Sequence, residues 1–199
     1  MNKYIFSIII AFVLTTALAF TQSGPTMKLS IGQESKLSLE GNSTMHEYSA
    51  KASQLLGSAV VDSFLFTEKN NARSFLQADI TIPVKKLSSG NEKLDDKMYD
   101  ALEADDNPNI TYHLTSDSIT FINKDTCTIK LTGTLTVAGK QKSIEMTATL
   151  LKHQNNSVNI RGSKELLMTD FGVEPPSMMF GLLKTEDKVI IRFDLLLQQ

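Results

Sequence analysis

Two long stretches of this chain alternate strictly between apolar and polar side chains. In the first stretch the apolar positions are Cys127, Ile129, Leu131, Gly133, Leu135 and Val137. Threonine or lysine stands at every position between them, and the same alternation runs from residue 143 to residue 150. A period of two places one set of side chains on each face of a β-strand. Because Gly139 provides a turn between the two stretches, they predict a long antiparallel hairpin with one face in a core.

Other stretches of the chain also have the character of strands. Alternate residues are apolar between residues 76 and 84, with polar side chains between them. Shorter runs at 35–40, 45–53, 109–115, 157–167 and 188–197 bring the total to about eight strands. The chain is therefore predicted to be built mainly from strands that each have one buried face.

The strand period is interrupted between residues 90 and 105 and again at residues 170–181; the first interruption has a helical pattern. The apolar positions Leu94, Met98, Ala101 and Leu102 follow helical spacing. Asn91 stands where an N-cap residue accepts a hydrogen bond from a first-turn amide. This segment predicts one short amphipathic helix.

Long antiparallel strands with a single helix favour one fold class. There is no regular alternation of strand and helix, so we expect an all-β, lipocalin-like antiparallel barrel of about eight strands with one short helix. An immunoglobulin-like sandwich is the rival, but its strands are shorter and it usually buries a tryptophan, which this chain lacks. The interior of an eight-stranded barrel is filled by side chains or holds one slender ligand.

Charge and composition exclude several functions. The 20 basic and 22 acidic residues leave no basic field to hold a phosphate backbone, so nucleic acid is not expected as a partner. Cys127 is the single cysteine, which excludes an intramolecular disulfide and any multi-cysteine metal site. The histidines, His46, His113 and His153, are not spaced as metal ligands. No nucleophile, base and orienting partner can be assembled, so we expect no enzyme, no cofactor and no metal site.

The N-terminus has the features of a secretion signal. Lys3 precedes an apolar run at residues 4–14, and Ala17 and Ala19 form the small-x-small pattern of a cleavage site. We expect residues 1–19 to be a signal peptide, residues 20–34 a flexible segment, and residues 35–199 the barrel domain. An uncleaved membrane anchor is the alternative, but the run is shorter than the roughly 20 residues that a bilayer requires. The mature protein is predicted to be periplasmic or secreted, without stable membrane insertion.

Four blocks of sequence carry a resemblance to a known family. They are Val84 to Met98 with the Asn-Pro-Asn of 107–109, the Leu-Thr-Gly-Thr-Leu-Thr-Val of 131–137, the Asp-Phe-Gly-Val of 170–173, and the last strand at 187–195. In this order they resemble the YceI family of bacterial lipocalin-like proteins, over nearly the whole mature chain. The resemblance implies an extended eight-stranded barrel, bacterial export, and a long apolar tunnel for an isoprenoid or other lipid-like chain.

The tunnel and its cover define the candidate ligand-binding residues. The Pro-rich segment 170–181, with its adjacent methionines, is expected to fold over the tunnel as a lid. Methionine is flexible enough to line a pocket for variable apolar ligands, although it also fills gaps in irregular cores. The candidate residues are Ile80, Ile82, Leu131, Leu135, Val137, Met146, Phe171, Met178, Met179, Phe180 and Phe193.

Two functions remain open at this stage. The first is an exported carrier or buffer for an isoprenoid or fatty-acyl amphiphile, in which burial of about 0.8 kcal/mol per methylene provides the affinity. The second is a non-catalytic structural, assembly or redox accessory protein whose barrel is filled by its own side chains. Either could form a homodimer, which the sequence leaves open.

The predicted cleavage site is directly testable. Because Ala17 and Ala19 fit the peptidase pattern, the exported protein should begin at Phe20. Intact mass and N-terminal sequencing of protein from the native host check this. Recovery of intact Met1 in the membrane fraction would contradict it.

Overall fold

The computed structural model of the chain describes residues 25–44, 46–66, 75–178 and 183–199. The predicted signal peptide, residues 1–19, lies outside them. The described strands and helices are β1 (Thr26–Ile31), β2 (Lys36–Ser43), β3 (Glu47–Ala52), β4 (Leu56–Asp62), η1 (Ser63–Phe66), β5 (Phe75–Pro83), η2 (Val84–Lys86), β6 (Leu87–Ser88), α1 (Glu92–Ala101), β7 (Asn109–Phe121), β8 (Thr126–Val137), β9 (Lys140–Lys152), β10 (Val158–Leu167), η3 (Met168–Phe171), β11 (Ser177–Met178) and β12 (Leu183–Gln198). The η elements are short 3₁₀ helices.

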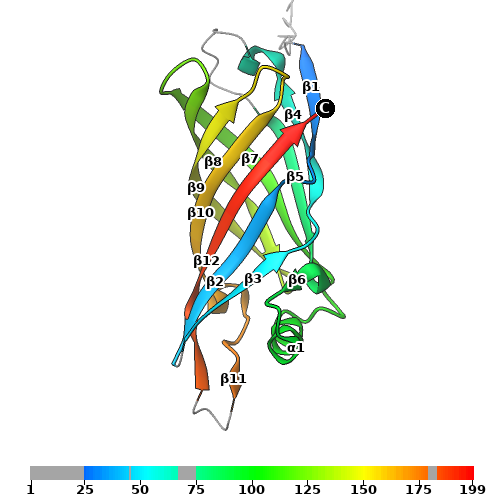
Figure 1. The fold of residues 1–199 in the computed structure, drawn as a ribbon, viewed down its shortest axis with the longest axis vertical. Helices are drawn as coiled ribbons and strands as arrows, with labels where there is room; N and C mark the ends of the chain where they lie inside the picture. The colour runs from blue at the N-terminus through cyan, green and yellow to red at the C-terminus, as the bar shows by residue number, and fades with distance from the viewer. Residues whose placement is uncertain (1–24, 45, 67–74, 179–182) are drawn as a thin grey trace, which may run out of the picture.

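Eight antiparallel strands close into a barrel, in the order β1, β4, β5, β7, β8, β9, β10 and β12 (Figure 1). β1 completes the ring by pairing with β12 at Ser30↔Gln198 and Ile31↔Leu197. β12 is longer than its partners. Its segment from Thr185 to Asp194 pairs with β2, and β3 and β6 continue the sheet beyond β2. The predicted all-β, lipocalin-like barrel is confirmed, and α1 is the one α-helix among the described residues.

The predicted hairpin forms the longest uninterrupted part of the wall. β8 and β9 pair from Val137↔Lys140 at the turn to Thr126↔Leu151 at the far end. Ala138 and the following glycine both have positive φ, 45° and 71°, as a tight two-residue hairpin turn requires. The predicted inward residues of β8 from Cys127 to Leu135 are buried and Val137 is half-buried, whereas the threonines between them are half-exposed.

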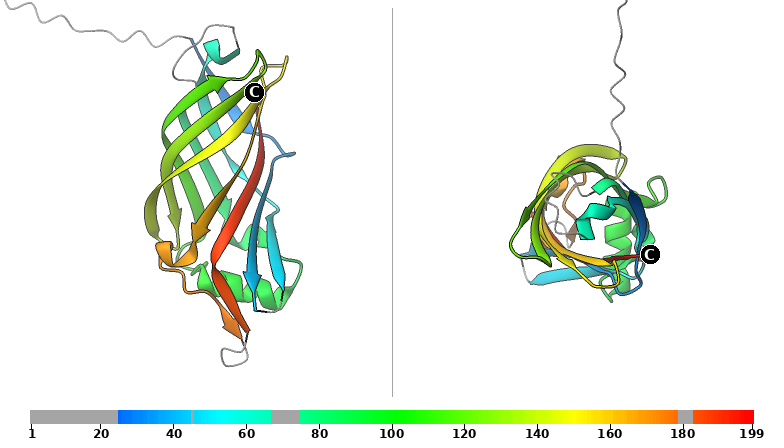
Figure 2. Two further views of the ribbon diagram at one scale, coloured as in Figure 1. Left: turned by 90° about the vertical axis from the view of Figure 1, so that its left-hand side faces the viewer. Right: turned by 90° about the horizontal axis from the view of Figure 1, so that it is seen from above.

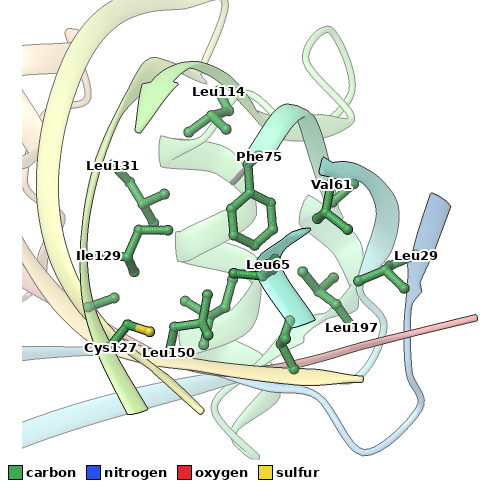
Figure 3. Close-up of a cluster of buried hydrophobic side chains, with 14 residues drawn as sticks. Leu29, Val61, Leu65, Phe75, Leu114, Cys127, Ile129, Leu131, Leu150 and Leu197 are labelled. Atoms are coloured by element: carbon green, nitrogen blue, oxygen red, sulfur yellow. The ribbon is translucent and has the colours of Figure 1, made fainter. Parts of the chain in front are cut away.

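One end of the barrel is filled by hydrophobic side chains. η1 enters the ring of strands at this end, as the view from above shows (Figure 2). Leu65 of η1 packs among Phe75, Leu114, Ile129 and Leu150, and Figure 3 shows these side chains converging in the barrel interior. This close-packed cluster closes the end of the barrel.

The other end carries α1, which lies beside β6 (Figure 1). The side chain of Asn91 accepts hydrogen bonds from the backbone N–H groups of Lys93 and Leu94, so the predicted N-cap is confirmed. A second hydrophobic cluster lies here and includes Val84 and Leu102. The two clusters therefore lie at opposite ends of one continuous barrel.

The beginning of the barrel differs from the expectation. Residues 20–34 were expected to be flexible, but Thr26–Ile31 forms β1, and Leu29 is fully buried. The alternation of Met27, Leu29 and Ile31 in β1 is short. The burial of Leu29 depends on strands that lie far away in the sequence. β4 was also not predicted, because Gly57 and the small residues after it carry little hydrophobic signal.

Removal of the helix cap should weaken the protein without unfolding it. Asn91→Ala leaves two first-turn N–H groups without their acceptor, so the free energy of unfolding should fall by about 1 kcal/mol. Asn91→Ser, which can still accept a hydrogen bond, should retain most of the stability. Denaturant unfolding midpoints measure both, and an unchanged midpoint in Asn91→Ala would contradict the capping role.

Candidate ligand-binding cavity

A cavity of about 240 Å³ lies inside the barrel and borders both hydrophobic clusters. It is lined by inward-facing strand residues, by one face of α1 and by residues of η3. Most of the lining side chains are aliphatic or aromatic. Concave apolar spaces with a few polar groups are the usual form of small-molecule sites.

The structure brings most of the predicted site residues together around this cavity. The lining residues from the predicted set are Ile80, Ile82, Leu131, Leu135, Val137, Met146, Phe171 and Phe193. Met178 belongs to β11, whereas Met179 and Phe180 lie outside the described residues. Contact of any of these side chains with a ligand stays a prediction.

The helix supplies one wall of the cavity. Leu94, Met98, Ala101 and Leu102 all line it, because their spacing places them on one face of α1. Met98 lines it alongside Met146 of β9 and Met168 of η3. Unbranched methionine side chains can change rotamer at little cost, so this wall is adaptable.

A buried carboxylate fixes α1 in this position. Asp95 accepts hydrogen bonds from Ser88 Oγ, Ser89 N and Ser89 Oγ, at 2.6 to 2.7 Å. Burial acts to raise the pKa of Asp95, but these hydrogen bonds outweigh it and hold the pKa below its ordinary value. The Tyr99 hydroxyl adds a hydrogen bond to the Leu87 carbonyl at 2.6 Å. The helix is thus tied to β6 by side-chain contacts.

The wall is incomplete between β9 and β10. In this fully described stretch, their ladder runs only from Val158↔Lys152 to Gly162↔Ala148. Beyond it the rest of β10 has no ladder partner on the β9 side, and η3 packs against β9, β10 and β12 instead. Phe171 of η3 is buried there. Side chains, not backbone hydrogen bonds, therefore close this part of the barrel.

Tyr112 is a polar cavity residue that sequence reasoning missed. Its ring lies over Gly133 of the neighbouring strand, where a Cβ would overlap it. Its hydroxyl is buried and has no hydrogen-bond partner among the described residues, and burial raises its pKa to about 12. Its aromatic character hid it in the apolar pattern of β7.

Two further polar residues, Tyr48 of β3 and Lys164 of β10, line the cavity. Tyr48 lies over Gly41, and burial together with the negative charge of Glu186 raises its pKa to about 12. Lys164 stands on the inward face of β10. The alternation of β10 was readable in the sequence, so the inward position of Lys164 could have been found there.

Among the residues that the structure describes, no group of three or more His, Cys, Asp or Glu is placed to hold a metal ion. Cys127 is fully buried, as its place among the apolar positions of β8 predicts, and burial raises the pKa of its thiol. None of the described helices has the length and apolar character needed to cross a bilayer.

A closed antiparallel barrel around an apolar cavity defines the lipocalin-like class of barrel. Within this class, residues 28–197 match the model of the YceI-like domain, and the chain belongs to that family. No curated protein sequence matches the chain.

Solved structures show the same fold at low sequence identity. BcnA from Burkholderia cenocepacia is 18% identical with a TM-score of 0.63, over 81% of this chain and 95% of that chain. A polyisoprenoid binding domain from Saccharophagus degradans is 12% identical with a TM-score of 0.61, over 86% and 97%. The Campylobacter jejuni YCEI protein is 19% identical with a TM-score of 0.54, over 74% and 82%.

The unpartnered hydroxyl of Tyr112 gives a prediction on stability. Tyr112→Phe removes a buried polar group that makes no hydrogen bond, so the free energy of unfolding should be unchanged or rise by up to about 1 kcal/mol. Tyr99→Phe is the matched control, because it breaks the bond to Leu87 and should cost about 1 kcal/mol. Denaturant unfolding measures the change in the free energy of unfolding of the two variants. Equal losses of stability would show that the Tyr112 hydroxyl has a partner.

Proposed function

We propose that this protein is an exported, non-catalytic binding protein that holds an isoprenoid or other lipid-like amphiphile in its barrel, as a carrier or buffer. The observation that supports this most strongly is the apolar cavity between the two hydrophobic clusters. Its lining offers contact to an alkyl or prenyl chain. Binding of this kind requires no chemical step.

The size of the cavity limits the ligand to a slender one. A volume of about 240 Å³ lies just below the roughly 300–1,000 Å³ of typical sites for drug-sized ligands. The three methionines of the lining can move aside to lengthen it. Each buried methylene contributes about 0.8 kcal/mol, so affinity should increase with the length of chain that the cavity accepts.

The family supports the same proposal. The domain from Saccharophagus degradans is described as polyisoprenoid binding, and the fold of this chain is similar to it. YceI-like proteins are generally periplasmic, which agrees with the export expected from residues 1–19.

The proposal is tested by variants of two neighbouring residues on β8. Leu135 lines the cavity and Thr134 lies on the other face of the strand. Leu135→Phe adds volume without charge, so it should exclude or shorten the bound chain while the barrel stays folded. Leu135→Arg buries an unpaired charge and should lower both lipid load and stability, whereas Thr134→Arg should change neither. Native mass spectrometry and solvent extraction of each variant measure the lipid load.

The alternative function gives a different result in the same experiment. A structural, assembly or redox accessory protein with a filled barrel would carry no lipid in any variant. An unchanged lipid load in Leu135→Phe would place the ligand elsewhere and contradict the proposed site.

A further inference from the structure

Lys164 is the one lysine or arginine among the described residues that line the cavity. It alternates on β10 with outward-facing polar residues, and its strand partner is Ile191, which also lines the cavity. Lys164 is half-buried. A cation on the inner face of an apolar barrel is unusual, because burial of a charge is costly unless an opposite charge faces it.

No carboxylate of the described residues pairs with Lys164. The other charged cavity residue, Asp79, lies 2.6 Å from His113 across the β5–β7 pair. Three carboxylates on the neighbouring parts of β10, η3 and β12 have other partners: Glu165 with Lys188, Asp170 with Lys142, and Asp187 with Thr169. The carboxylate of Glu186 on β12 acts on Tyr48. Within the described part of the chain, Lys164 therefore has no ion-pair partner.

Lys164 stands where the wall is incomplete. It lies two residues beyond Gly162, the last residue of β10 that pairs with β9. From Lys164 back past Gly162, the inner face of β10 leads to Ile160, which pairs with Leu195 of β12, and both line the cavity. A ligand with its polar end at this unpaired stretch of the wall would have its chain in the apolar interior.

We propose that Lys164 is a headgroup subsite for a single negative charge, and that the ligand is a long-chain carboxylate. This inference rests on the proposed function and specifies its ligand class. The carboxylate lies at Lys164, where β10 no longer pairs with β9, and the chain runs toward Ile160 and Leu195. Tyr48 extends over Gly41 toward β12 and supplies a neutral hydroxyl donor at the same end.

The charge of the site argues for a carboxylate and against a phosphate or diphosphate. Phosphate sites typically combine several donors, often with the planar fork of arginine. The described lining of this cavity offers one ammonium group, and Glu186 adds a negative charge near Tyr48. A headgroup with two or more negative charges would meet repulsion without a second cation to offset it.

The test compares three amphiphiles with the same chain and different headgroups. Delipidated exported protein is titrated calorimetrically with dodecanoate, dodecanol and dodecyl phosphate at pH 8. Dodecanoate should bind about tenfold or more tightly than dodecanol, as a charge-assisted contact with Lys164 predicts. Lys164→Met should remove this preference and leave the affinity for dodecanol unchanged, whereas Lys164→Arg should retain it.

Controls separate this inference from the function on which it rests. Lys130→Met makes the same change on the exposed face of β8, where Lys130 pairs with Glu145, and should leave the preference intact. Thermal unfolding midpoints show whether each variant is folded, and Lys164→Gln provides a second neutral variant. Equal binding of dodecanoate and dodecanol by the wild type, or tighter Lys164-dependent binding of dodecyl phosphate, would overturn the carboxylate subsite while lipid binding stands. Absence of binding by all three would overturn both.

Discussion

The pairing of β1 with β12 is the contact on which the rest of this structure depends. Two residue pairs, Ser30↔Gln198 and Ile31↔Leu197, join the first strand to the last. Because they close the ring, the two faces of every strand become an inside and an outside, and no edge of the ring is left open at that position. The alternation in the sequence then decides which side chains face the interior. An open sheet with the same alternation would have a core face but no enclosed cavity.

Filling of the interior is uneven along the barrel. Leu65 of η1 adds a side chain from within the ring at one end, whereas the other end is bounded by a helix lying across it (Figures 1 and 3). Aromatic rings lie over inward glycines in between, as Tyr112 does over Gly133. A glycine in a strand lets a large ring lie flat against the backbone, which keeps the centre of the barrel open. The cavity is therefore the space that these large and small residues leave between two packed ends.

Sequence reasoning predicted the parts of the fold that depend on local signals. The β8–β9 hairpin, the Asn91 cap and the inward face around Leu135 each follow from neighbouring residues. It missed β1, because the burial of Leu29 depends on strands far away in the sequence. It missed Tyr112 as a polar group, because whether a hydroxyl finds a partner depends on three-dimensional packing. Long-range pairing and the satisfaction of buried polar groups are not visible in a local pattern.

The wall between β9 and β10 is held differently from the rest. Elsewhere, backbone hydrogen bonds join neighbouring strands, and opening them would expose several N–H and C=O groups at once. Beyond Gly162, η3 closes the wall through its side chains, among them the ion pair of Asp170 with Lys142. Such half-exposed pairs contribute at most about 1 kcal/mol each. Separating η3 from the strands would expose the buried ring of Phe171 but would break no strand ladder, so side-chain packing holds this part of the wall in place of the backbone pairing that joins β9 and β10 before Gly162.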